Sequence, residues 1–202
     1  MNIALIGASG NAGSRILAEL IRRGHTVTAI VRNPEKVTTG SNVTARKADA
    51  FDKAGLSALL RGHEAVISAI HFTASDPEVL IAAVRESGVS RYLVIGGAGS
   101  LEVGPGVALV DTPDFPVVYK EEAIRGGVFL DRLRREDDLQ WTFLSPSAVF
   151  EAGERTGIFR LGGDQLLVGH HGSRISFEDY AVALVDELEQ PRHIRQRFTV
   201  GY

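Results

Sequence analysis

The sequence predicts an α/β fold with a doubly wound parallel sheet. Short apolar runs rich in valine and isoleucine alternate with stretches of helical periodicity through the first half of the chain. Near-continuous apolar runs are typical of parallel strands that helices cover on both faces. Because crossovers between parallel strands are right-handed, this β-α-β alternation also predicts a ligand crevice at the carboxyl ends of the strands.

The expected elements of the first half follow in order. The strands are Ile3 to Ile6, Val27 to Val31, Val43 to Ala48, Ala65 to Ile70 and Tyr92 to Ile95. The helices between them are Gly13 to Arg23, Ala54 to Arg61 and Asp76 to Ser87. Asp76 suits an N-cap and Pro77 the first position of a helix, whereas Gly24 and Gly88 suit helix ends.

The second half continues the alternation less regularly. Its expected elements are a helix Tyr119 to Arg135, a strand Trp141 to Leu144, an irregular segment Ser145 to Gly163, short strands Asp164 to Val168 and Gly172 to Ile175 around a His170-His171-Gly172 turn, a helix Phe177 to Glu189 and a strand Arg197 to Val200. The length favours a single domain over residues 1–202. Residues 145–202 are expected to form a small C-terminal region on the substrate side.

The composition of the chain limits the classes of partner that it could bind. A net charge of -3 lacks the excess of lysine and arginine that nucleic-acid or membrane-surface binding requires. The chain has no cysteine, and His170 and His171 have no acidic or cysteine ligand at a convincing spacing, so no metal site is expected. No basic leader precedes the first apolar run, and no window is apolar enough to span a membrane. We expect a cytoplasmic protein with a small-molecule partner; a homodimer is compatible with the sequence.

A glycine-rich turn follows the first expected strand. The sequence Gly7-Ala8-Ser9-Gly10-Asn11-Ala12-Gly13 has GxxGxxG spacing and leads into a helix. This is the context of a dinucleotide-binding, Rossmann-type turn. Gly7 permits the tight turn, Gly10 lets the backbone approach a pyrophosphate, and Gly13 lets the helix pack closely. The amides of Asn11 and Ala12 are expected to point at the anion, with Ser9 beside them.

The ends of the next strands indicate which dinucleotide. An acidic residue at the end of the second strand would bind the ribose 2'-hydroxyl of NAD, but this chain has Arg32 there. A guanidinium pairs with a 2'-phosphate, so NADP(H) is the expected cofactor, with Asn33 and Lys36 assisting; the alternative is a solvated surface arginine. Asp49, followed by Ala50, is placed either at the adenine amine or as the cap of a turn.

Three further positions border the expected nicotinamide end. Ala69, Ile70 and His71 follow the fourth core strand, and small residues there allow close approach. His71 is a candidate to line the acceptor site, to bind the nicotinamide amide or to supply a proton near neutral pH, although a packing role is equally compatible.

Gly97 lies in the loop after the next strand. Arg155 either reaches an anionic substrate or pairs with Glu154 or Asp164.

These features resemble the atypical short-chain dehydrogenase/reductases, in particular the NAD(P)H-binding group named for NADH-flavin reductase activity. More distantly, the chain is similar to biliverdin reductase B/flavin reductases and to NmrA-like redox sensors. The resemblance extends over nearly the whole chain, and its segments are Gly7 to Gly13, Val94 to Ser100, Asp114 to Pro116, Tyr119-Lys120, Trp141 to Pro146, Gly153 to Gly157 and Ile175 to Ala181. It implies that Pro146 backs the nicotinamide, that Tyr119 approaches the substrate and that Lys120 approaches the nicotinamide ribose. The alternatives are a strand-terminating turn for Pro146, helix-start packing for Tyr119 and a solvated amine for Lys120.

One departure from the main short-chain dehydrogenase pattern limits the reactions that the protein could catalyse. Those enzymes protonate a carbonyl with Tyr-x-x-x-Lys, but the residue four positions after Tyr119 is Ala123. Lys120 directly follows Tyr119 and so points about 100 degrees away on a helix. Gly96 and Gly97 occupy the stretch where the partner serine is expected. Carbonyl reduction by the usual triad is therefore disfavoured.

The leading hypothesis is an NADPH-dependent oxidoreductase that transfers hydride to a flavin or quinone-like acceptor, with flavin as substrate rather than bound prosthetic group. In such a reaction the protein would act mainly by positioning the cofactor and the acceptor. The alternative is a non-catalytic NADP(H)-binding redox sensor of NmrA-like type. A third hypothesis, a sugar-nucleotide or isoprenoid-type epimerase or reductase, would need a more extensive C-terminal region.

Overall fold

An eight-stranded sheet forms the centre of the protein, in a computed structural model that describes all 202 residues. The strand order is β3-β2-β1-β4-β5-β8-β12-β10, and every neighbouring pair is parallel except β10 with β12. The bounds are β1 Asn2–Ile6, β2 Thr26–Val31, β3 Val43–Lys47, β4 Ala65–Ser68, β5 Arg91–Ile95, β8 Gln140–Pro146, β10 Arg160–Gly162 and β12 Gln196–Gly201. The α/β doubly wound prediction is confirmed.

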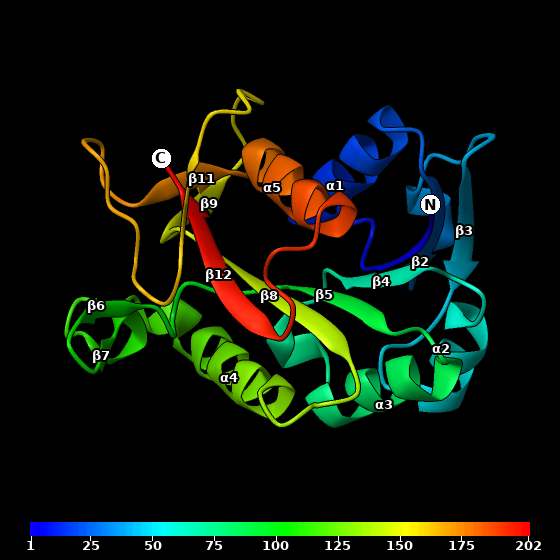
Figure 1. The fold of residues 1–202 in the computed structure, drawn as a ribbon, viewed down its shortest axis with the longest axis horizontal. Coiled ribbons are helices and arrows are strands. Elements are labelled where there is room, and N and C mark those ends of the chain that lie inside the picture. The colour runs from blue at the N-terminus through cyan, green and yellow to red at the C-terminus, as the bar shows by residue number, and fades with distance from the viewer.

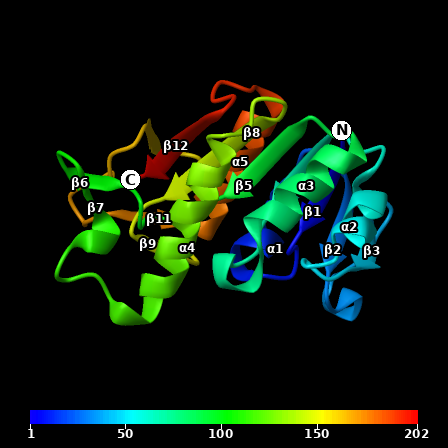
Figure 2. The ribbon, with the colours of Figure 1, turned by 90° about the horizontal axis from the view of Figure 1, so that it is seen from below.

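Five helices cover the two faces of this sheet. Helices α1 and α5 pack side by side on one face, and α2, α3 and α4 cover the other (Figures 1 and 2). The bounds are α1 Asn11–Arg22, α2 Lys53–Leu60, α3 Pro77–Ser87, α4 Val117–Leu133 and α5 Phe177–Glu189. Two separate clusters of buried apolar side chains follow from this layering, one on each face of the sheet. None of the helices is both long and apolar enough to cross a membrane.

The helix ends show why these segments form helices. Asp76 caps α3 by accepting a hydrogen bond from the Glu78 amide at 2.8 Å, and Pro77 is the first helical residue. Gly88 ends the same helix in the left-handed region, at φ +82°, which glycine adopts without steric cost. Ser176 caps α5 through the Asp179 amide at 3.0 Å. The caps predicted for α3 are therefore confirmed.

The smaller elements depart from the prediction. The short strand predicted over Gly172 to Ile175 is present as β11 Arg174–Ser176, shifted by one to two residues. It pairs with an unpredicted strand, β9 Val149–Glu151, and a second unpredicted pair is β6 Glu102–Gly104 with β7 Val107–Ala108. The strand predicted over Asp164 to Val168 is wrong. That segment forms only an isolated bridge between Gln165 and Glu102. The Glu102 amide donates to the Asp164 carbonyl and the Leu166 amide donates to the Glu102 carbonyl, both at 2.9 Å, and no further pairing extends these two bonds into a strand. Gly169 and Gly172 form the predicted turn around the two histidines.

The order of the strands creates a switch point. From β1 the chain builds β2 and β3 on one side, and then crosses back to build β4 and β5 on the other. Loops leaving β1 and β4 at their carboxyl ends therefore diverge, which opens the crevice where doubly wound proteins bind ligands. The glycine turn and the segment from Ala69 to His71 both lie at this edge.

Candidate dinucleotide site

The three glycines of the turn after β1 have different roles. Gly7 has a φ of +86°, and a Cβ built on it would lie 2.3 Å from the Ala69 carbonyl oxygen. A Cβ on Gly13 would lie 2.2 Å from the Gly7 carbonyl oxygen. At Gly10 φ is -75° and the nearest atom to a built Cβ is 3.4 Å away. The protein's own packing thus requires glycine at 7 and 13, whereas at Gly10 it leaves space on the exposed side.

The start of α1 suits an anion. Gly10 is the N-cap and offers no side-chain hydrogen bond, and no acidic residue lies in the first turn. Ser9, Gly10 and Asn11 are exposed. The first amides of a helix have no partner within the helix, and the dipole there favours negative charge. These residues fit a dinucleotide pyrophosphate, with the amides of Asn11 and Ala12 as donors.

Cations gather where β2 and β3 end. Arg32 directly follows β2, is exposed and has no carboxylate partner. Lys47 is the last residue of β3 and stands in register with Val31, so it lies beside the same strand end. Lys36 is exposed in the short 3-10 helix Pro34–Lys36 that follows. The sequence pattern singled out Arg32 and Lys36; Lys47 emerges only from the strand register.

Asp49 has a local role in the structure. Its carboxylate accepts a hydrogen bond from the Phe51 amide at 3.0 Å, which is the geometry of an Asx turn. Helix α2 is capped instead by Asp52, which accepts from the Gly55 amide at 3.0 Å. Of the two roles considered for Asp49, the turn is the one formed. Ala50 lies within that turn and is half-buried.

The carboxyl ends of β4, β5 and β8 adjoin one another. The Ala69 amide donates to the Ile6 carbonyl at 2.8 Å, and the Gly96 amide donates to the Leu144 carbonyl at 2.8 Å. These bonds tie the strand ends of β1, β4, β5 and β8 into one edge. Gly97 follows with open space around it, the nearest atom to a built Cβ being on Phe72 at 3.8 Å. Pro146 is the buried last residue of β8.

His71 is held by a residue that the sequence did not single out. Its side chain is 83% exposed, and Nδ1 lies 3.2 Å from Oε1 of Glu122 on α4. The same carboxylate accepts from the Phe72 amide at 2.7 Å and from the Thr73 amide and hydroxyl at 2.8 and 2.7 Å. Glu122 therefore caps the 3-10 helix Phe72–Ala74 from another element.

These contacts shift both pKa values. Burial raises the pKa of Glu122, but hydrogen bonds from His71, Thr73 and Phe72 outweigh it and lower the pKa to about 2. The hydrogen bond to the Glu122 carboxylate raises the pKa of His71, against a smaller effect of desolvation. The pair therefore favours a charged imidazole beside a charged carboxylate.

Tyr119 and Lys120 lie near the start of α4, and both are exposed. The Tyr119 side chain is 63% exposed, and no hydrogen bond links it to Lys120 or to His71. Ala123, at the position of the lysine in Tyr-x-x-x-Lys, packs against Gly99: a Cβ on Gly99 would lie 2.6 Å from the Ala123 Cβ. The structure thus places no lysine where it would orient the tyrosine.

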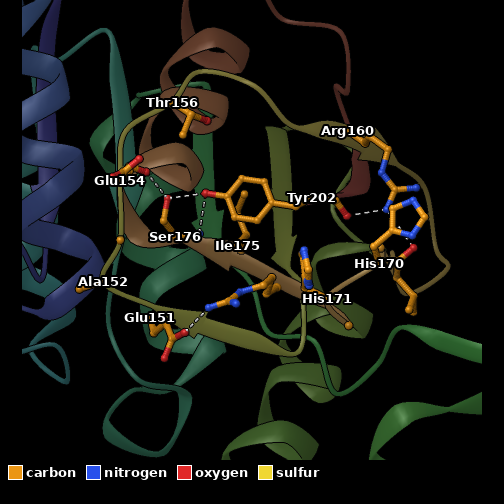
Figure 3. Close-up of a pocket in the computed structure, with 15 residues that line it drawn as sticks. Glu151, Ala152, Glu154, Thr156, Arg160, His170, His171, Ile175, Ser176 and Tyr202 are labelled. Carbon is orange, nitrogen blue, oxygen red and sulfur yellow. Dashed lines mark hydrogen bonds and ion pairs between the residues drawn. The ribbon is translucent and has the colours of Figure 1, made fainter.

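A large cavity lies elsewhere, among the loops around β9 and β11. Its volume is about 870 Å³, and its walls include Arg160, His170, His171, Glu151 and Arg174 (Figure 3). Tyr202 lies across it, and its hydroxyl bonds Ser176 Oγ and Asp179, both at 2.8 Å. Arg174 pairs with Glu151 at 2.8 Å. The side chains of His170 and His171 form no hydrogen bond or ion pair, and none of the predicted cofactor residues lines the cavity.

The two partners considered for Arg155 are wrong. Arg155 instead forms a bidentate ion pair with Glu19 of α1, with two N–O distances of 2.8 Å. Glu19 is buried and 136 residues away in the sequence, so no local pattern identified it. The arginine therefore anchors the loop after β9 to the helix that begins at the glycine turn.

The fold and this edge define an α/β dinucleotide-binding protein. A family model described as NAD(P)H-binding matches residues 7–191. The chain accordingly belongs to the NAD(P)H-binding family of atypical short-chain dehydrogenase/reductases, an oxidoreductase family, and the predicted resemblance is confirmed.

Individual relatives agree with this assignment. YwnB of Bacillus subtilis, an uncharacterized protein, is 42% identical over 99% of this chain and 98% of its own. A candidate epimerase from Bacteroides thetaiotaomicron is 41% identical, with a TM-score of 0.94 over 100% of this chain and 96% of that one. A candidate NADH-flavin reductase from Streptococcus pneumoniae is 38% identical, with a TM-score of 0.85 over 100% of this chain and 99% of that one.

Proposed function

We propose that the protein is an NADPH-dependent reductase that transfers hydride to a flavin or quinone-like acceptor. The observation that carries the proposal is the shared edge of the sheet. An anion-ready helix start, an exposed Arg32 without a carboxylate partner and the His71–Glu122 pair all lie at carboxyl strand ends. Such a site binds a phosphorylated dinucleotide and holds a proton donor at the same edge.

Different residues along this edge bind different parts of the dinucleotide. Amides of Asn11 and Ala12 bind the pyrophosphate, and Arg32, with Lys36 and Lys47 nearby, binds the 2'-phosphate. Ala69, Ile70, Gly97 and Pro146 border the nicotinamide. When bound, the reduced nicotinamide supplies a hydride, and the protein's contribution is to orient the acceptor and exclude water.

The groups that the site lacks and those that it contains both favour a conjugated ring over an isolated ketone as the acceptor. Without an oriented tyrosine-lysine pair, the site lacks the usual acid for an isolated ketone. A conjugated ring spreads the incoming electrons and needs only one proton from a nearby donor, so positioning does most of the work. The name of the Streptococcus pneumoniae relative points to the same class of acceptor.

Anaerobic mixing tests the proposal. The protein is mixed with NADPH and, separately, FMN, FAD, riboflavin and simple quinones, and nucleotide and acceptor absorbance are followed together. We expect equimolar loss of NADPH and oxidised acceptor for at least one of them. No NADPH oxidation with any of these acceptors would overturn the proposal.

The second candidate is a non-catalytic redox sensor. It is favoured by exposed apolar side chains on α4, which offer a partner protein or a second copy an apolar surface: Val117, Val118, Ile124 and Val128. A sensor binds NADP and NADPH with different affinities and does not interconvert them. Calorimetry with both nucleotides, beside the turnover assay, separates the two candidates, and light scattering measures whether the protein forms a homodimer.

A further inference from the structure

The protein lacks the tyrosine-lysine acid of its wider family, yet the same helix contributes a different titratable group to the same edge. Glu122 lies on α4, one turn after Tyr119. Both of its carboxylate oxygens accept hydrogen bonds from the turn that follows β4, with four donor-acceptor distances between 2.7 and 3.2 Å. Two of these donors are main-chain amides, so the carboxylate is fixed whether or not His71 is charged.

We propose that Glu122 is the positioning residue of a His71–Glu122 pair in which His71 delivers the proton to the acceptor. The proposal deepens the reductase function and rests on it. A charged imidazole donates through Nδ1 to Glu122 and presents its Nε2–H bond away from the carboxylate. The side chain is 83% exposed, so the ring is accessible from solvent.

The acceptor gains a hydride from the reduced nicotinamide, and is reduced by two electrons while the nicotinamide is oxidised. The Nε2–H bond of His71 breaks, the proton joins a nitrogen or oxygen of the acceptor, and the electron pair stays on the imidazole. The neutral imidazole then regains a proton from solvent, and Glu122 remains ionised throughout.

Of the other charged residues near the turn, Asp76, Glu78 and Glu121 have partners of their own, and Lys120 is exposed and makes no contact with His71. On α3, Asp76 accepts from the Glu78 amide, and the Glu78 carboxylate pairs with Arg132 of α4 at 2.5 Å. On α4, Glu121 pairs with Arg125 at 2.9 Å. Among the charged groups of the elements packed on the turn, Glu122 is thus the one that contacts His71.

An NMR titration of histidine side chains tests the pair without cofactor. The His71 signal is identified from its loss in His71→Asn, and its pKa is compared in wild type, Glu122→Gln and Glu121→Gln. The Glu121 variant is the matched control, because it removes the same charge from an adjacent residue whose side chain is 71% exposed. We expect the His71 pKa to fall in Glu122→Gln and to stay at the wild-type value in Glu121→Gln.

Kinetics then test the proton transfer. His71→Asn should lower kcat/KM by roughly 10²- to 10⁴-fold and remove the loss of activity at rising pH, with an unchanged melting temperature. In Glu122→Gln that loss should begin at a lower pH. An unchanged His71 pKa in Glu122→Gln, or a wild-type pH profile in His71→Asn, would overturn the proposal. If no acceptor is reduced at all, the reductase function fails, while the NMR titration still decides whether Glu122 holds the imidazolium.

Discussion

Arg155 and Glu19 form a bidentate ion pair that joins the loop after β9 to the middle of α1. Arg23 reaches the same carboxylate at 2.8 Å and Arg22 at 3.5 Å, so three arginines pair with one buried negative charge. The pair fixes the helix whose first turn faces the expected pyrophosphate.

Removing this arginine should destabilise the fold. In Arg155→Ala the Glu19 carboxylate keeps Arg23 but loses two hydrogen bonds, and we expect the free energy of unfolding to fall by about 1–3 kcal/mol. Urea denaturation followed by circular dichroism measures it. Arg174→Ala, which breaks the exposed pair with Glu151, should cost only about 0–1 kcal/mol. Equal costs for the two variants would contradict the assignment.

Acid should weaken the same contact. The hydrogen bond from Arg155 is the largest cause that lowers the Glu19 pKa, from 4.5 to about 2. A group whose pKa is lower in the folded state stabilises the fold above its unfolded pKa, and this stability is lost as pH falls through the folded pKa. The free energy of unfolding should therefore decrease between about pH 4.5 and pH 2, and less steeply in Arg155→Ala. Parallel pH curves for the two proteins would argue against this contact.

Alanine variants of Gly13 and Gly10 form a matched pair, because the first should affect stability and the second nucleotide binding. In Gly13→Ala the added Cβ would lie 2.2 Å from a backbone oxygen, so the turn must shift and the protein should lose at least about 1–3 kcal/mol of stability. In Gly10→Ala the space and the φ of -75° accept alanine. We expect its melting temperature to stay near wild type while Kd for NADPH rises about tenfold or more, equal to about 1.4 kcal/mol. Normal NADPH affinity in Gly10→Ala would place the pyrophosphate elsewhere.

Arg32 should select the phosphorylated nucleotide. Arg32→Asp removes a charge-assisted contact worth about 1.5–3 kcal/mol and adds a repulsive carboxylate, so the preference for NADPH over NADH should fall by at least about tenfold. Arg61→Asp makes the same charge change at the end of α2, away from the strand ends that carry Arg32 and Lys47. The control should keep the wild-type preference; an equal loss in both variants would indicate a general charge effect.

Most of the fold could be predicted from the sequence because its signals are local. Helix α5 begins and ends at the predicted residues, since Ser176 caps it and Glu189 is its last helical residue. The short strands β9 and β10 could not be predicted, because three residues carry too little periodicity and each depends on a partner far along the chain.

The strand-end positions of the candidate site and the candidate proton donor His71 could be inferred from the sequence, but the partner of His71, Glu122, could not. Gly7, Gly13 and Arg32 follow strands that the sequence shows, so their shared edge could be inferred. Glu122 contacts a residue 51 positions earlier, and nothing in its neighbourhood distinguishes it from Glu121. Only the packing of α4 against the turn after β4 separates the two glutamates.

Calorimetric titration of the wild-type protein with NADPH and with NADH tests the central claim most directly. We predict one nucleotide site per chain and an affinity for NADPH at least about tenfold higher than for NADH, a difference of about 1.4 kcal/mol. Equal affinities, or no binding of either nucleotide, would contradict the placement of a phosphorylated dinucleotide between the glycine turn and Arg32.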